Sequence, residues 1–277
     1  MCATVVSMAE SSGVSGIDTT VAHPARVWNY WLGGKDNYPV DRAVGDQVKD
    51  LFPQVAEVAQ GDRLFLRRCV SHLVREEGIT QFLDIGTGLP TANNTHEVAQ
   101  ALNPETQVVY VDNDPLVLAH ARALLNGTDA GKTQFVGSDL RDVEKVLAAA
   151  KETLDLDRPV GLTLMGTMGH FEIEEALRLV RAYVDRLAPG SFFAVCDGVM
   201  AHMEVDDAER AAEGMRIWEE QVAQKYHMRT VAEFERFFEG FELVEPGVVS
   251  VFRWRPEPAE VGTVRDLPQY AGLAKKA

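Results

Sequence analysis

The sequence Phe82-Leu-Asp-Ile-Gly-Thr-Gly-Leu-Pro-Thr91 is an apolar segment that contains an acid and runs into a glycine turn. The part from Gln81 to Ile85 is typical of a short buried strand, because it is mostly apolar and a glycine follows it at once. Gly86 and Gly88 let the backbone turn tightly and approach a ligand with no side chain between them. Asn94-Thr-His-Glu97 then offers a helix N-cap and a capping-box glutamate. Strand, turn and helix N-terminus together predict a nucleotide-type pocket.

The composition is that of an ordinary globular protein. The chain has 277 residues, of which 46% are hydrophobic and 25% charged, so it can bury one sizeable core. Acidic residues outnumber basic residues by 42 to 27, and the formal net charge is -15. Such a surface repels phosphate backbones. We therefore expect one domain with additions and a partner other than nucleic acid.

The cysteines and the lack of targeting signals indicate a location. Cys2, Cys69 and Cys196 are far apart and have no metal-ligand spacing, which predicts reduced thiols, no metal site and a cytoplasmic protein. The segment from Met1 to Gly16 has no Lys or Arg and no long apolar core, so it lacks the parts of a secretory signal. No stretch approaches the roughly 18 apolar residues that a spanning helix needs, so we expect no membrane contact. The oligomeric state is left open.

The first part of the chain predicts a tail and a helical cap. Residues 1–18 are rich in Ser, Gly, Ala and Val without a period, and we interpret them as a mobile tail. Residues 19–78 predict a helical cap, whose last helix covers 53–77 and is broken at Gly61. A shorter helix starts at Pro24, stops at the glycines 33–34 and carries a group of aromatic residues, Trp28, Tyr30 and Trp31. These rings either fill the core or form a lid over the pocket, where they would meet a cationic sulfonium or a purine.

From residue 79 onward, strand-like segments alternate with helical ones. Apolar strands are expected at 81–85, 107–111, 133–136, 160–165 and 191–196. The four helices between them include one over 172–187 with a single apolar stripe. Alternation of this kind predicts an α/β protein with a Rossmann-like doubly wound, mostly parallel sheet and helices on both faces.

The remainder predicts an insertion, a hairpin and a second tail. A helical insertion of about 205–226 follows the fifth strand, and two strands within 240–254 are expected to form a hairpin that makes the sheet seven-stranded. The domain would then span 79–255. Residues 256–277 contain three prolines, and we predict an irregular C-terminal tail.

Acidic residues lie at or just after the ends of the first three strands, at the sheet edge where open α/β sheets bind ligands. Asp112 lies 26 positions after Gly86, where a carboxylate would accept both hydroxyls of a ribose. Asp139 would accept a hydrogen bond from an adenine amino group while Leu140 covers a ring face. Asp84, below the glycine turn, is poorly placed for a pyrophosphate and suits a ligand with an ammonium group.

These motifs carry a resemblance to a known class of enzyme. Asp84-Ile-Gly-Thr-Gly88, Tyr110-Val-Asp112, Gly137-Ser-Asp139 and Leu187-Ala-Pro-Gly-Ser191 resemble the Rossmann-like S-adenosylmethionine-dependent methyltransferases. Leu32-Gly-Gly-Lys-Asp-Asn37, with Gly86-Thr-Gly-Leu-Pro-Thr91 and Asn94-Thr-His-Glu97, is similar to a bacterial methyltransferase family long catalogued as a domain of unknown function. One departure is Pro90, which replaces the third glycine of the general turn.

The resemblance implies S-adenosylmethionine as the cofactor and a set of residues that bind it. It implies binding by the glycine turn and by Asp84, Asp112 and Asp139. The full set that we predict to bind the cofactor is Gly34, Asp84, Gly86, Gly88, Asp112, Asn113, Asp139, Leu140 and Met165. The acceptor is not implied by the family, and we predict a small molecule. Methyl transfer from a sulfonium needs alignment and exclusion of water, and a base only if the acceptor is protonated.

Three residues are candidates for the acceptor side of the reaction. His170 follows the fourth strand and has a pKa range suited to a base, although it would also serve as a helix cap or an exposed histidine. Tyr30 and Tyr38 are the alternatives. Two other functions remain open: a nicotinamide-dependent oxidoreductase, against which the missing last glycine at Thr91 argues, and a module that binds S-adenosylmethionine without turning it over.

Overall fold

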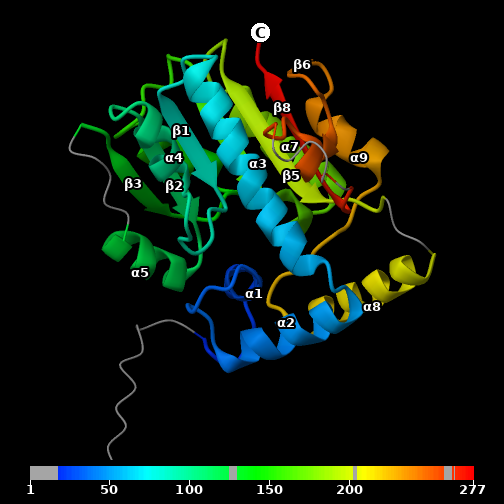
Figure 1. Cartoon of the computed structure of the whole chain (residues 1–277). Helices are drawn as coiled ribbons and strands as arrows, with labels where there is room; N and C mark the ends of the chain where they lie inside the picture. The colour runs from blue at the N-terminus through cyan, green and yellow to red at the C-terminus, as the bar shows by residue number, and fades with distance from the viewer. Residues whose placement is uncertain (1–17, 125–129, 202–204, 259–263, 265) are drawn as a thin grey trace, which may run out of the picture.

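A computed structural model describes residues 18–124, 130–201, 205–258, 264 and 266–277. The predicted mobile tail at 1–18 therefore falls almost entirely outside the described residues. The described part is a central sheet with helices on both faces and a group of helices below one end of the sheet (Figure 1). The predicted Rossmann-like α/β fold is confirmed.

The sheet contains a parallel half and an antiparallel half. Its order is β3-β2-β1-β4-β5-β8-β6, with β7 also paired to β8. The strands are β1 (Gln81–Ile85), β2 (Gln107–Asp112), β3 (Thr133–Gly137), β4 (Gly161–Met165), β5 (Phe192–Gly198), β6 (Glu242–Leu243), β7 (Val249–Ser250) and β8 (Gln269–Lys275). Strands β1 to β5 are parallel, and β8 runs antiparallel to β5. The chain reverses its direction of winding between β1 and β4, which is where a doubly wound sheet opens a crevice.

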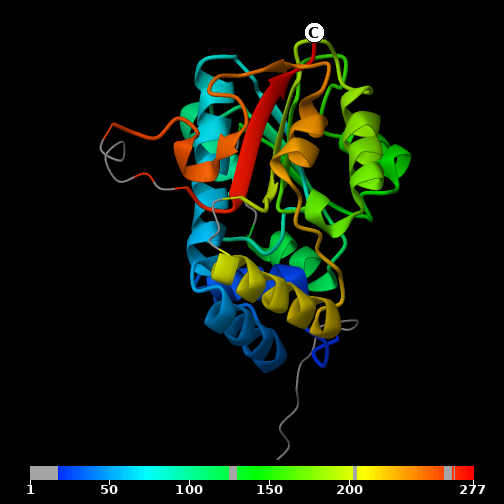
Figure 2. The ribbon, with the colours of Figure 1, turned by 90° about the vertical axis from the view of Figure 1, so that its right-hand side faces the viewer.

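Two apolar layers hold helices on the sheet. On one face, α3 (Val55–Arg75), α4 (Thr95–Leu102) and the short helix η3 (Val251–Arg253) cover one hydrophobic cluster. On the other face, α6 (Val143–Ala150), α7 (Ile173–Val184), α9 (Val231–Glu235) and η2 (Arg236–Phe238) cover a larger one. Figure 2 shows β8 between these two layers. Helix α5 (Pro115–Leu124) lies beside β3.

A cap of helices lies at the carboxyl ends of the parallel strands. It consists of α1 (Pro24–Trp31), α2 (Pro39–Leu51), the start of α3 and α8 (Val205–Gln221), the predicted insertion after β5. The rings of Trp31 and Trp218 pack 5.8 Å apart, and the Trp31 indole donates a hydrogen bond to the Gly45 carbonyl. The cap therefore has an apolar core of its own.

The C-terminal segment corrects the prediction. Residues 256–277 were expected to be an irregular tail, but Gln269–Lys275 is a fully paired internal strand. Its Ala- and Gly-rich sequence has little intrinsic preference for a strand, so tertiary packing decides its structure. Gly272 is required there because a Cβ would lie 2.6 Å from the Phe238 ring.

Two smaller predictions were also wrong. The expected hairpin within 240–254 does not form, because β6 and β7 are two residues each and both pair with β8, which gives eight strands and not seven. Helix α3 is not broken at Gly61. A Cβ at Gly61 would lie 2.6 Å from a methyl group of Val251, so this glycine allows close packing of α3 on η3.

The role of β8 predicts unequal effects of two matched substitutions. Leu273→Ala removes a side chain that is 0% exposed in β8, and we expect it to lower the free energy of unfolding by about 2–5 kcal/mol. Leu243→Ala removes the same atoms from β6, where the side chain is 40% exposed, and should cost less than about 1 kcal/mol. Denaturant titration measures both. Equal effects would contradict a central position for β8.

Candidate functional site

A cavity of about 510 Å³ lies between the cap and the carboxyl ends of the parallel strands. Its floor is formed by the segments that follow β1, β2, β3 and β4, and its other walls come from α1, α3 and the segment that follows α8. Of the twelve residues predicted to act in the site, nine line this cavity and three do not. Lining residues among them are Asp84, Gly86, Gly88, Asp112, Asn113, Asp139, Leu140, Met165 and His170.

The glycine turn after β1 forms one side of the cavity. Gly86 and Gly88 have φ angles of 71° and 65°, which side chains disfavour. A Cβ at Gly86 would also lie 2.3 Å from the Thr167 hydroxyl oxygen. Gly86 therefore lets the turn lie against the segment after β4, whereas Gly88 is favoured by its backbone conformation alone.

Asp112 links this turn to the end of β2. One carboxylate oxygen accepts the Gly88 N–H at 2.8 Å, and the other accepts the Asp114 N–H at 2.9 Å. Burial raises the pKa of Asp112, and these backbone donors favour its ionised form. Each carboxylate oxygen keeps a lone pair for further donors, as a ribose diol requires.

Asp84 and Arg63 both line the cavity and carry opposite charges. Asp84 is 5% exposed and accepts a hydrogen bond of 2.5 Å from the Thr95 hydroxyl, and burial raises its pKa. Arg63, from α3, donates to the carbonyl oxygens of Ala92 and Asn93. Its buried Nε has no hydrogen-bond partner among the described residues. The pair therefore offers a negative group for the ammonium and a positive group for the carboxylate of a zwitterion.

Sequence reasoning did not identify Arg63. The helix that carries it reads as a packing helix, and its apolar stripe accounts for the pattern without any ligand. The adjacent charged pair Asp62-Arg63 within this mostly apolar pattern was the only signal in the sequence.

The residues after β3 form the far end of the cavity. Asp139 accepts a forked ion pair from Arg141, with its shortest contact at 2.6 Å, and this hydrogen bonding lowers the pKa of Asp139. Leu140 lines the cavity beside it, whereas Asn113, after β2, is an exposed residue of the cavity rim. The carboxylate expected to contact adenine therefore already has a cationic partner.

His170 lies on the opposite side, in η1 (Met168–His170) after β4. Its Nδ1 is 2.7 Å from the Lys225 carbonyl oxygen, which can only accept, so the neutral ring carries its proton on Nδ1. Burial lowers the pKa of His170 to about 4. Near neutral pH the ring is therefore uncharged, and Nε2 is the nitrogen with a free lone pair.

The remaining predicted residues do not line the cavity. The Tyr30 hydroxyl donates to Asp46 at 2.5 Å, Tyr38 lies under the Arg26 guanidinium, and Gly34 packs on the Asn29 side chain. Of the aromatic group in α1, Trp28 lines the cavity and Trp31 is in the cap core. Trp31 thus fits the interpretation that the rings fill a core, and Trp28 has the position that a lid residue needs.

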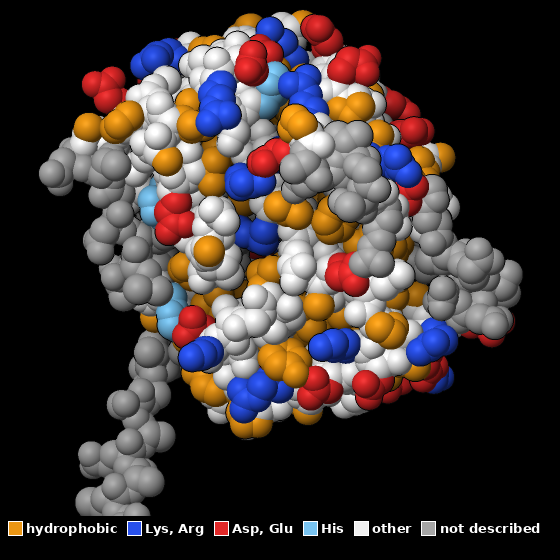
Figure 3. Space-filling model, in the orientation of Figure 1, with side chains coloured by type: hydrophobic (Ala, Val, Ile, Leu, Met, Phe, Trp, Pro, Cys, Tyr) orange, Lys and Arg blue, Asp and Glu red, His pale blue; other side chains and the backbone are white. Residues whose placement is uncertain are grey.

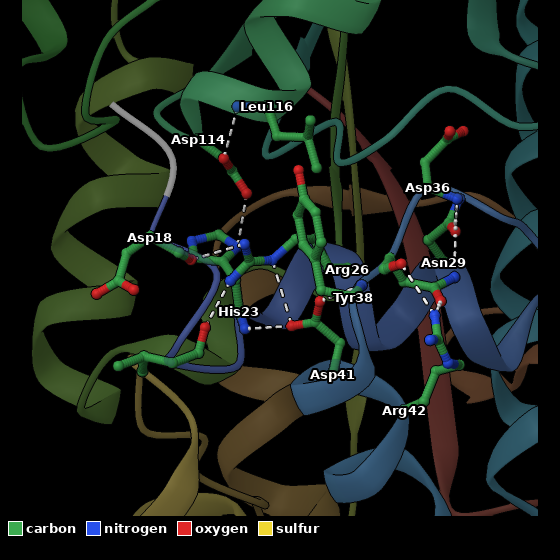
Figure 4. A network of polar contacts seen from close by, with 12 residues as sticks. Asp18, His23, Arg26, Asn29, Asp36, Tyr38, Asp41, Arg42, Asp114 and Leu116 are labelled. Carbon is green, nitrogen blue, oxygen red and sulfur yellow. Dashed lines mark hydrogen bonds and ion pairs between the residues drawn. The ribbon is translucent and has the colours of Figure 1, made fainter. Parts of the chain in front are cut away.

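A network of polar contacts joins the cap to Asp114, in the loop after β2 (Figure 4). Asp114 contacts the His23 ring at 2.9 Å and accepts the Leu116 N–H at 2.8 Å. Asp41, at 0% exposure, accepts the His23 backbone N–H at 3.0 Å and contacts Arg26 at 3.2 Å. Because Asp112 accepts the N–H of Asp114, the cap is held against the cavity through one continuous set of contacts.

Sequence reasoning also missed Asp62, a second buried acid in the cavity wall. It is 3% exposed on α3 and accepts hydrogen bonds from the Cys196 thiol at 2.8 Å and from the Gln269 amide at 2.8 and 3.0 Å. Burial raises its pKa from 3.8 to about 7. Its partners lie on β5 and β8, and β8 was not recognised as a strand, so the sequence could not place them together.

The comparisons with known proteins agree with this geometry. The model of a family described as S-adenosyl methyltransferase matches residues 10–277. The chain belongs to this S-adenosyl methyltransferase family. A DUF574 family protein from Streptomyces avermitilis is 40% identical, with a TM-score of 0.88 over 94% of this chain and 99% of that one. A proposed methyltransferase from Thermobifida fusca is 39% identical, with a TM-score of 0.84 over 95% and 97%.

More distant matches concern the fold alone. The mitomycin 7-O-methyltransferase MmcR is 13% identical, with a TM-score of 0.51 over 95% of this chain and 74% of that one. Curated proteins give no match. The family makes this chain an S-adenosylmethionine-dependent methyltransferase, and neither a nicotinamide-dependent oxidoreductase nor a non-catalytic module is supported. Across the described part of the methyltransferase, no helix is long and apolar enough to cross a membrane.

The raised pKa of Asp62 predicts a pH-dependent gain in stability for Asp62→Asn. An acid whose pKa is higher in the folded state stabilises the fold at low pH, and this contribution is lost as pH rises from about 4 to about 7. The amide cannot ionise, so the variant should gain stability relative to the parent across this window. The gain is bounded by about 1.4 kcal/mol per pKa unit, or about 4 kcal/mol in total.

Urea titrations of both proteins at several pH values measure this difference. A difference in unfolding free energy that stays constant between pH 4 and pH 8 would contradict the burial of an ionisable Asp62.

Proposed function

We propose that this methyltransferase acts on a small-molecule acceptor enclosed between the cap and the carboxyl end of β4. The observation that carries the proposal is the cavity, which is roofed by α1 and α3 and has the size of small-ligand sites. A formal charge of -15 disfavours a nucleic acid acceptor. On the face drawn in Figure 3, Lys and Arg side chains lie interspersed with Asp and Glu, as on an ordinary surface.

The residues on the β1 to β3 side fit the cofactor. The lone pairs that remain on Asp112 suit the ribose hydroxyls, and the open backbone at Gly88 suits close approach. Asp84 would receive the ammonium of the methionine part, and the unpartnered Nε of Arg63 would receive its carboxylate. Leu140 would cover the adenine ring, while Asn113 and Met165 complete the walls.

The residues on the β4 side would serve the acceptor. When bound, S-adenosylmethionine supplies an activated methyl group, so the protein has to align the acceptor and exclude water. His170 is neutral and presents a lone pair on Nε2, because Lys225 fixes the proton on Nδ1. We assign it a hydrogen bond that orients the acceptor, because a ring with a pKa of about 4 is a weak base. Trp28, in the cap, would close the cavity against solvent.

Asp112→Ala is expected to weaken binding of S-adenosylmethionine by about 10- to 100-fold, because it removes charged hydrogen bonds to the ribose. Isothermal titration calorimetry measures the change. Asp157→Ala, which removes an exposed acid outside the cavity, is the matched control and should bind as the parent does. Loss of affinity in both variants, or in neither, would contradict the ribose role of Asp112.

The class of acceptor can be tested with a cofactor that carries an isotope-labelled methyl group. The protein is incubated with the labelled cofactor and a bacterial extract, and the extract is then separated into low-molecular-weight, protein and nucleic acid fractions. We expect the label in low-molecular-weight products other than the cofactor itself, and less of it there with His170→Phe. Label in the nucleic acid or protein fraction would overturn the small-molecule proposal.

A further inference from the structure

Asp62 is a buried carboxylate with no role in holding the cofactor as described above. It lines the cavity, yet it is 3% exposed, and its partners are a thiol and an amide and not a cation. Two charged residues act on Asp62 in opposite directions, because Arg63 attracts its negative charge and Asp197 repels it. A carboxylate buried in this way costs stability, and such costs concentrate at functional sites.

The position of Asp62 is on the acceptor side of the cavity. Its partner Cys196 is on β5, directly opposite Met165 of β4, and its partner Gln269 is on β8. Its Oδ2 lies 3.7 Å from where a Cβ of Gly166 would be, at the carboxyl end of β4. The ribose acid Asp112 ends β2, on the other side of β1. Asp62 therefore lies away from the nucleoside half of the site.

The hydrogen bonds that Asp62 makes with the described residues leave one acceptor position on its carboxylate open. Oδ1 accepts from both the Cys196 thiol and the Gln269 amide, whereas Oδ2 accepts only from Gln269 among the described contacts. A carboxylate oxygen has two lone pairs, so Oδ2 can accept one more hydrogen bond. The β5 and β8 partners fix the carboxylate plane, so the group is preorganised for that donor.

We propose that Asp62 accepts a hydrogen bond from the attacking group of the methyl acceptor, which makes the acceptor a hydroxyl or amine compound and not a carboxylic acid. The inference rests on the proposed function. A hydroxyl or amine donates to Oδ2 and keeps a lone pair for the methyl group. A carboxylate acceptor would instead meet a like charge in a buried site, which is costly. The raised pKa of Asp62 agrees with a carboxylate that is poised to share a proton near neutral pH.

Sinefungin is a suitable probe because an amine-bearing carbon replaces the sulfonium and its methyl group. Its ammonium lies at the position of the transferred methyl, next to the attacking group, and so offers Asp62 a donor in the same part of the cavity. We expect Asp62→Asn to lower sinefungin affinity at least about tenfold and to change S-adenosylhomocysteine affinity less than about threefold, because only sinefungin carries this donor. Calorimetry with the two ligands at one pH gives the ratio of affinities.

Asp197→Asn is the matched control. Asp197 is also buried and acidic, and it lies next along β5 from Cys196, but its Oδ1 accepts from the Gly169 N–H and the Tyr226 hydroxyl and it does not line the cavity. Asp197→Asn also replaces a buried carboxylate with an amide. We expect its ratio of sinefungin affinity to S-adenosylhomocysteine affinity to equal that of the parent. A ratio that changes equally in both variants would reduce Asp62 to a general electrostatic effect and overturn the proposal.

The outcomes separate the two levels of the account. If the parent binds neither ligand, the proposed cofactor site fails. If S-adenosylhomocysteine binds and Asp62→Asn leaves the ratio unchanged, only the present inference fails. A crystal structure of the parent with sinefungin tests the inference even if the variant does not fold. We expect the ammonium nitrogen within about 3 Å of Asp62 Oδ2, and a separation above about 5 Å would overturn it.

Discussion

The hydrogen bond from the Gly88 N–H to the Asp112 carboxylate is the contact on which the site depends. It joins the turn after β1 to the end of β2, so two neighbouring parallel strands open toward the same small volume. The left-handed backbone at Gly88 is what brings this N–H to the carboxylate. Asp112 in turn accepts the N–H of Asp114, which contacts His23 of the cap. One acid thereby aligns the floor of the cavity and, through its neighbour, the roof.

The cavity combines several buried acids that differ in their partners. Asp112 has backbone donors, Asp84 has a hydroxyl and a nearby guanidinium, and Asp62 has a thiol and an amide. Backbone donors and a cation favour the ionised form, which suits a cofactor that presents hydroxyls and an ammonium. A thiol and an amide compensate burial less completely, and the pKa of Asp62 is accordingly raised to about 7. The division between cofactor and acceptor sides thus follows the chemistry of the partners.

Much of the fold was predictable because local signals and tertiary structure agree there. Strands β1 to β5 are apolar segments bounded by turns, and Asn94 and Glu97 form the capping box that their spacing predicts. Strand β8 was missed because its Ala and Gly residues carry no strand signal, and only the space between β5 and β6 selects them. The same cause hid the partner of Asp62, since Gln269 comes to it across 207 positions of sequence. Tyr30 in α1 and Tyr38 before α2 do not line the cavity, because a sequence does not say which side of a helix or loop faces a cavity.

The central claim is that the cavity binds S-adenosylmethionine with its ribose at Asp112 and its methionine part at Asp84 and Arg63. The most direct measurement is a crystal structure of this methyltransferase with S-adenosylhomocysteine bound. We expect both ribose hydroxyls within hydrogen-bond distance of the Asp112 carboxylate, the amino group at Asp84 and the carboxylate at Arg63 Nε. A ligand bound in the reverse direction, with its methionine part toward Asp139, would contradict it.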